Sequence, residues 1–206
     1  MPRAFAQLTF TPAVRAQQER MGSAGSYAKF IDSGPQQGHL IGEAEKAFIE
    51  ARDGFYQATV SETGWPYVQY RGGPAGFLRV LGPQTIGYAD FSGNRQYISR
   101  GNLDGNDRIS MILMDYANRR RLKILGRVEI TEGASAAASL HPQGVEAPAE
   151  RAVLIRVEAL DWNCPRHITP RFTEAELKPH LDALGVQLAQ LQAENERLKQ
   201  DLAAAR

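Results

Sequence analysis

The chain has 206 residues, 43% of them hydrophobic and 23% charged, which is typical of a globular domain with an appendage. Lysine and arginine total 24 and aspartate and glutamate 23, so the net charge of +1 gives no reason to expect nucleic acid or an anionic membrane as a partner. The chain has no run of about 18 apolar residues and no signal-peptide core, and Cys164 is its only cysteine, so we expect a cytoplasmic protein without disulfides.

Residues 1–41 are predicted to form an N-terminal extension of helices and loops. Thr11 can cap a helix over 11–21, Pro12 suits its first position, and Gly22 ends it. A loop is expected at 32–39. A short helix over 42–54 then opens the main domain, which we place at 42–172.

From residue 55 the hydrophobicity alternates with a period of two residues, which indicates strands. Turn signals such as Thr63-Gly64 separate them. Six or seven short strands at hairpin spacing favour an antiparallel barrel or sandwich, and a closed barrel leaves no edge strand to protect. The strands are expected at 55–60, 67–71, 77–81, 86–91, 109–115, 121–130 and 153–160.

Residues 173–206 are predicted to form a C-terminal coiled-coil helix. Its seam residues are spaced alternately four and three apart, with Asn195 at an a position, where asparagine specifies a parallel two-stranded coil. Glu194 and Asp201 fall at g positions, opposite Lys199 and Arg206 at e of a parallel partner. The alternative is an amphipathic helix packed on its own domain. The seam consists of Leu177, Leu181, Leu184, Leu188, Leu191, Asn195, Leu198 and Leu202.

The stretch "YADFSGNRQYISRGNL" (88–103) places polar residues where a predicted strand passes into a predicted helix. Ser92 can cap the helix, Gly93 lets a ligand approach the backbone, and Arg95 offers a guanidinium fork that fits phosphate. The free N–H groups at a helix start also favour an anion. The plain alternative is an ordinary cap with a solvated arginine.

The hairpin "WPYVQYRGGPAGFLRVLGPQTIGYADFSGNRQ" leads into this stretch, and "NRRRLKILGRVEI" follows one strand later. This order of motifs resembles the pyridoxamine 5′-phosphate oxidase-like, FMN-binding split-barrel family over about residues 42–160. The resemblance implies a mainly β fold, an antiparallel six-stranded split β-barrel of Greek-key type with flanking helices. It also implies FMN as cofactor and a homodimer with the flavin at the interface.

Carried over to this chain, the resemblance implies a set of cofactor-binding residues. Ser92, Asn94 and Arg95 hold the phosphate, with help from Arg71 or Gln69. The flavin ring lies near Gln69, Tyr70, Asp90 and Phe91. Arg121 and Lys123 match the strand that reaches the ring from the partner subunit, although simple solvation explains their alternating strand face equally well.

The segment "DWNCPRHITPRF" (161–172) contains Trp162, Arg166 and His167, the residue types of a Trp…Arg-x-His set that the family's oxidases place near flavin and substrate. The spacing here is shorter, which argues against pyridoxamine phosphate as the substrate. Cys164 and His167 lack a third group that would make a metal site or a nucleophile, so we expect no metal and a packed thiol.

These features predict an FMN-dependent oxidoreductase acting on a small molecule. The alternative is a non-catalytic flavin-binding, sensing or storage protein. Haem binding in the same fold lacks support, because none of His39, His141, His167 and His180 stands out as an axial ligand. No G-x-G-x-x-G fingerprint is present, so any NAD(P)H is expected to bind transiently over the flavin.

Overall fold

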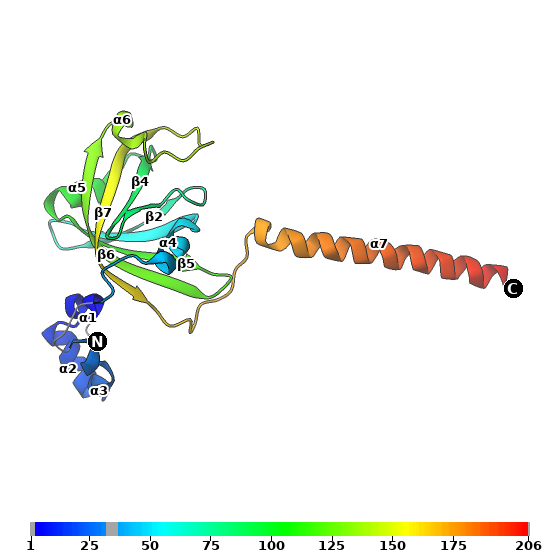
Figure 1. The fold of residues 1–206 in the computed structure, drawn as a ribbon, viewed down its shortest axis with the longest axis horizontal. Coiled ribbons are helices and arrows are strands. Elements are labelled where there is room, and N and C mark those ends of the chain that lie inside the picture. Colours follow the sequence, from blue (N-terminus) through cyan, green and yellow to red (C-terminus); the bar gives the residue numbers. More distant parts are fainter. Residues whose placement is uncertain (1–2, 32–36, 206) are drawn as a thin grey trace.

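The computed structural model describes residues 3–31 and 37–205, so most of the loop expected at 32–39 lies outside the described residues. Seven strands form one antiparallel sheet in the order β2-β1-β5-β6-β7-β4-β3, which curls around a core (Figure 1). Each predicted strand is present, and β6 and β7 are longer than predicted. The strands are β1 Gly54–Val60, β2 Pro66–Gly72, β3 Arg79–Gly82, β4 Thr85–Phe91, β5 Arg108–Asp115, β6 Arg120–Glu132 and β7 Ala149–Trp162.

The sheet is open, so the expected closure into a barrel is wrong, and its seven strands match the seven predicted ranges rather than the six that the resemblance implies. Within the described residues, β2 and β3 form its two edges and do not pair with each other. The chain between them turns inward and buries Phe77 and Leu78. Phe77 stacks on Phe55 of β1 with ring centroids 5.7 Å apart, so side chains rather than backbone hydrogen bonds fill the seam.

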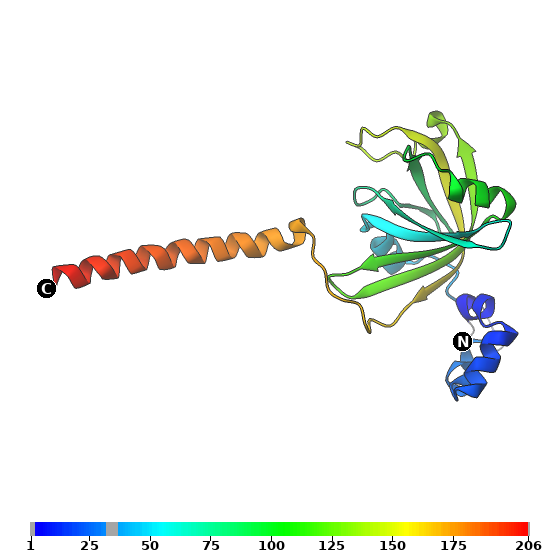
Figure 2. The ribbon, with the colours of Figure 1, turned by 180° about the vertical axis from the view of Figure 1, so that it is seen from behind.

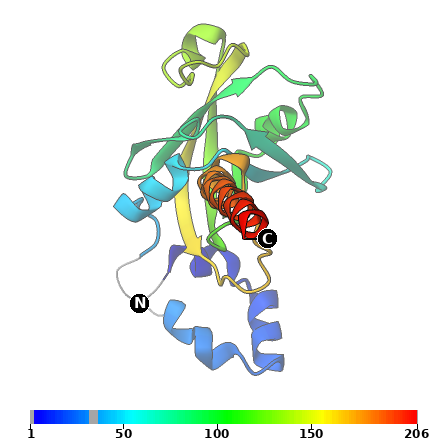
Figure 3. The same ribbon diagram turned by 90° about the vertical axis from the view of Figure 1, so that its right-hand side faces the viewer.

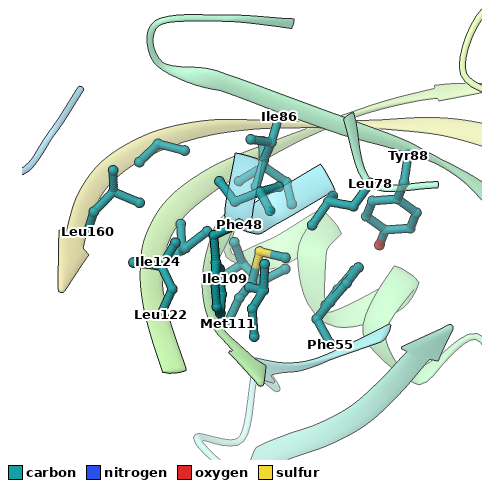
Figure 4. Packing of buried hydrophobic residues seen from close by; sticks show 14 of the residues in the cluster. Phe48, Phe55, Leu78, Ile86, Tyr88, Ile109, Met111, Leu122, Ile124 and Leu160 are labelled. Atoms are coloured by element: carbon teal, nitrogen blue, oxygen red, sulfur yellow. The ribbon is translucent and has the colours of Figure 1, made fainter. Parts of the chain in front are cut away.

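The core lies inside the curled sheet and is closed at one end by α4 (Glu43–Glu50) (Figure 4). Tyr88 of β4 packs its ring edge against Phe55 at 5.4 Å. Its buried hydroxyl donates to Oε1 of Gln57 on β1 at 3.2 Å, which satisfies both polar groups. Large buried members include Phe48, Ile49, Ile86, Met111, Leu113, Leu122, Ile124, Ile155 and Val157.

The N-terminal extension contains short helices at one end of the sheet (Figure 2). Thr11 caps α2 as predicted, because its side chain accepts a hydrogen bond from the N–H of Val14 at 3.4 Å. Ala4 and Ala6 of the first helix are buried, whereas α2 buries no residue. These helices are α1 Ala4–Thr9, α2 Pro12–Arg20, α3 Ala24–Tyr27 and the 3-10 turn η1 Ala28–Phe30.

The C-terminal helix α7 (Glu174–Ala204) extends away from the sheet and buries no residue (Figures 1 and 3). Thr173 caps it, accepting from the N–H of Glu176 at 3.2 Å while Glu176 reaches back to the N–H of Thr173. The predicted helix is therefore confirmed, and the alternative of packing on its own domain is wrong. Pairing with a second helix stays a prediction.

None of the helices in the described part of the chain combines the length and apolarity that crossing a lipid bilayer requires.

Candidate functional site

A cleft of about 290 Å³ lies where the edge strand β2, the end of β4 and the start of α5 (Ile98–Gly105) meet. We call it the polar cleft. The structure brings most of the predicted phosphate and ring residues together in its wall, although they come from two hairpins. These residues are Gln69, Tyr70, Arg71, Asp90, Phe91, Asn94 and Arg95.

Strand alternation sets the directions of the β2 side chains. Gln69 and Arg71 are half-buried on one face, while Tyr70 between them is 55% exposed on the other and borders the cleft at its edge. Gly54 lies directly opposite Gly72 in the β1–β2 register, and the Tyr70 ring covers both glycines. A Cβ on Gly54 would come within 2.1 Å of the Tyr70 hydroxyl, so this ring position depends on glycine.

The turn between β4 and α5 differs from the predicted one. The helix begins at Ile98 rather than at Ser92, because Arg95 (φ 60°) and Tyr97 (φ 54°) adopt left-handed backbone conformations that interrupt a helix. Ser92 instead donates its N–H to the carbonyl of Pro148 at 2.9 Å, and it does not line the cleft. The predicted cap at Ser92 is therefore wrong, and the turn presents Asn94 and Arg95 without it.

A buried ion cluster forms the base of the polar cleft. Asp90 lies between two guanidinium groups, 2.8 Å from Nη1 of Arg71 and 3.0 Å from Nη1 of Arg151. Burial raises the pKa of Asp90, and the two arginines act in the opposite direction. Nε of Arg71 is buried without a hydrogen-bond partner among the described residues. Burial raises the pKa of the neighbouring Tyr88 phenol, and the Arg71 guanidinium acts on that pKa in the opposite direction, so Arg71 joins the ion cluster to the core.

Acidic residues compensate the other cations of the cleft. Arg151 also contacts Glu132 at 3.0 Å and Glu150 at 2.6 Å, and Arg100 contacts Glu132 at 2.8 Å. The hydrogen bond from Arg100, more than that from Arg151, lowers the pKa of Glu132. Arg95 differs, because within the described residues it forms no ion pair. A hydrogen bond with Tyr97 raises the pKa of this exposed guanidinium.

Sequence reasoning missed Arg151, Glu150 and Tyr97 as cleft residues. The last strand begins at Ala149, before the predicted start at 153, so the prediction leaves Arg151 outside the strand. In the register of β4 with β7 it stands directly opposite Asp90. The apolar neighbours Ala152, Val153 and Leu154 were the signal for an earlier strand start.

Four predicted residues lie elsewhere in the chain. Arg121 and Lys123 are on the outer face of β6, opposite Met114 and Ile112 of β5. The Trp162 indole donates to Oε1 of Glu45 at 2.7 Å, away from the cleft. Arg166 is exposed in the linker before α7. Within one chain, none of the four lines the polar cleft.

The reactive side chains of the linker and the histidines do not contribute to this cleft. None of the four histidines lines it, and both ring nitrogens of His141 face backbone carbonyls, of Pro142 at 3.1 Å and Ala147 at 2.9 Å. Cys164 is exposed, so the expected packed thiol is wrong. The reason is its position after the end of β7, where the linker leaves the core.

The fold and site define a mainly β protein with an arginine-rich cleft beside an edge strand. The chain belongs to the pyridoxamine 5′-phosphate oxidase family, whose model matches residues 41–164, more than half of the chain. No curated protein matches the sequence.

Several solved structures are similar to part of the chain. HupZ of Group A Streptococcus is 22% identical with a TM-score of 0.49, covering 64% of this chain and 99% of its own. An F420 reductase is 22% identical with a TM-score of 0.45, covering 59% of this chain and 98% of its own. An FMN-binding protein from Syntrophomonas wolfei subsp. wolfei is 11% identical with a TM-score of 0.46, covering 58% and 83%.

Proposed function

We propose that this chain binds FMN in the polar cleft and acts as an FMN-dependent oxidoreductase. The observation that carries the proposal is the cationic turn at the cleft: Arg95 is an exposed guanidinium that makes no ion pair among the described residues, and it lies in the same wall as Arg71. An unpaired arginine fork beside a second arginine suits a phosphate monoester. Membership of the family supports FMN as the molecule that carries it.

The residues present fit such a ligand. Arg71 lies in the wall of the polar cleft beside Arg95 and Asn94, where its guanidinium adds positive charge next to the proposed phosphate position. Oε1 of Gln69 accepts from the hydroxyl of Ser99 at 2.9 Å, which leaves its amide N–H groups to donate. Arg95 and Asn94 would hold the phosphate, and Gln69, Tyr70 and Phe91 would border the ring.

When bound, FMN supplies hydride and electron transfer, and the protein supplies binding and orientation. Asp90 holds Arg71 and Arg151 in place through ion pairs of 2.8 and 3.0 Å. Because these pairs are buried, the two guanidinium groups are fixed in the cleft wall, and the positive charge that the described carboxylates do not compensate is that of Arg95. The chain's own contribution is therefore orientation and charge.

The second candidate is a non-catalytic flavin-binding or storage protein. The observation that favours it is that the described cleft residues include no histidine or cysteine, while its buried carboxylate is committed to two arginines. Purified protein decides between the two. A yellow solution that NADH or NADPH bleaches and air restores supports the enzyme, and one inert to both supports the binding protein. A colourless protein that cannot be reconstituted with FMN contradicts both.

A homodimer is part of the proposal. The outer faces of β1, β2 and β5 form an apolar surface, the apolar sheet face, in which Tyr56 stands between Tyr70 and Ile112 in one cross-strand row. Val68 is 63% exposed and Tyr70 is 55% exposed, and a group of such apolar side chains on a surface indicates a contact with another protein. Lys123 continues the row beyond Ile112, so a second copy on this face would bring Lys123 and Arg121 to the interface. The face consists of Tyr56, Val60, Val68, Tyr70, Ile112 and Met114.

We further propose that α7 pairs with its copy as a parallel coiled coil. Its seam leucines are 39–64% exposed, which an isolated helix in water does not favour. Glu194 and Lys199 are placed for a g–e′ pair, and Asn195 selects the two-stranded register.

We also propose that the protein is cytoplasmic, because a single exposed cysteine without a disulfide partner fits a reducing compartment.

A further inference from the structure

A second cavity, of about 350 Å³, lies between the sheet and the linker that leads to α7. Three tyrosines from different strands and turns meet there, so we call it the tyrosine pocket. Tyr56 and Tyr70 are cross-strand neighbours with ring centroids 5.3 Å apart. Tyr116, which follows β5, contacts Tyr56 through its hydroxyl; burial, and after it this contact, raise the pKa of Tyr116.

Three charged side chains in the wall of the tyrosine pocket make no ion pair within the described residues: Asp53, Arg171 and Glu176. Glu176 is engaged by Thr173 in the cap of α7, which leaves Asp53 and Arg171. Within the described residues the carboxylate of Asp53 makes no ion pair. Burial raises the pKa of the Tyr70 phenol most, and the nearby Asp53 carboxylate raises it further. The guanidinium of Arg171 is held 4.9 Å over the Tyr116 ring and also lacks an acidic partner there. By contrast, Arg52 is already engaged, with Asp115 at 3.8 Å.

The chemistry of these groups selects a ligand class. Exposed tyrosine faces bind planar rings, and they bind cationic ones best. A free carboxylate adds to the preference for a positive ring, and a free guanidinium accepts a phosphate attached to that ring. The volume suits one ring with a sugar phosphate.

We propose that the tyrosine pocket binds a pyridinium ring carrying a phosphate, the nicotinamide end of an oxidised pyridine nucleotide, with the ring on Tyr56 and Tyr70, its charge facing Asp53 and its phosphate on Arg171. Tyr70 also borders the polar cleft, so the two ligands share one side chain. As a binding site the pocket stands independently of FMN. Its role beside a flavin rests on the proposed function.

The test is calorimetric titration of the full chain with three probes: nicotinamide mononucleotide, its reduced form with a neutral ring, and nicotinamide riboside without phosphate. We expect Arg171→Ala to weaken the mononucleotide about fivefold to tenfold and to leave the riboside unchanged. Asp53→Asn is expected to weaken the oxidised mononucleotide about threefold and to leave the reduced form unchanged. The matched control is Arg197→Ala, an exposed arginine on α7 outside the seam, which should bind all probes normally.

Arg95→Ala separates this proposal from the flavin proposal, because it should weaken FMN and spare the mononucleotide. Loss of mononucleotide binding in Arg95→Ala would place the probe in the polar cleft and overturn the inference. So would equal affinities in the wild type, Arg171→Ala and Asp53→Asn, or no binding at about millimolar concentration. If FMN does not bind at all, the proposed function fails while the mononucleotide titration still decides the tyrosine pocket.

Discussion

Replacing Arg95 with alanine tests the cofactor proposal most directly. A hydrogen bond to a charged group contributes about 1.5–3 kcal/mol, which corresponds to about a tenfold to 150-fold change in Kd. Because Arg95 is exposed and already hydrogen-bonds Tyr97, we expect the lower end of that range, about a tenfold increase in Kd. Stability should change by less than about 0.5 kcal/mol, since arginine and alanine tolerate the left-handed backbone at φ 60° about equally.

The assay for Arg95→Ala is fluorescence titration with FMN, paired with a melting curve. Arg95→Lys keeps the charge but loses the fork, so it should fall between the wild type and alanine. Arg108→Ala, an exposed arginine at the start of β5 and outside the polar cleft, serves as the control. If Arg95→Ala binds FMN as tightly as the wild type does, the role given to the turn is refuted, and Arg71 and Arg100 become the candidates for binding the phosphate.

Three further predictions concern stability and assembly. Glu132→Gln should lower the free energy of unfolding by less than about 1 kcal/mol at pH 7, because the carboxylate is half-exposed. The fold lowers the pKa of Glu132, so the stability difference between wild type and variant should shrink as the pH falls through that lowered pKa, which denaturant melts at several pH values would measure. Gly54→Ala should displace the Tyr70 ring, lowering stability by about 1 kcal/mol in a thermal melt and weakening nicotinamide mononucleotide in calorimetry. Deleting 174–206 should leave a less stable dimer that still binds FMN; a monomeric, colourless product in light scattering would show that the coil makes the dimer.

The strands could be predicted from the sequence because alternation is a local signal. Ile109, Met111 and Leu113 are buried on one face of β5, as their spacing indicates, and Ile112 and Met114 remain half-exposed on the other. The gap between the edge strands β2 and β3 is not a local feature. Phe77 and Leu78 fill it after a glycine-rich turn, and such packing leaves no periodic pattern in the sequence.

The site was predictable where it is local and missed where it is not. Asn94 and Arg95 share one turn, so the motif places them together. The helix start was predicted too early because Arg95 and Tyr97 adopt the left-handed backbone conformation, which a sequence usually signals with glycine. Arg151 reaches the cleft only through the register of β4 with β7, a pairing across some sixty residues that a turn motif cannot encode.

The apolar sheet face, the tyrosine pocket and α7 fit one arrangement. Tyr56 and Tyr70 belong to both the face and the pocket, and Thr173 and Glu176 at the start of α7 line that same pocket. In the proposed dimer, a two-fold axis through the apolar sheet face would bring the two α7 starts close together, as a coil between them requires. Sheet contacts would then form the interface while α7 adds to its stability, and each tyrosine pocket would lie at the border of that interface.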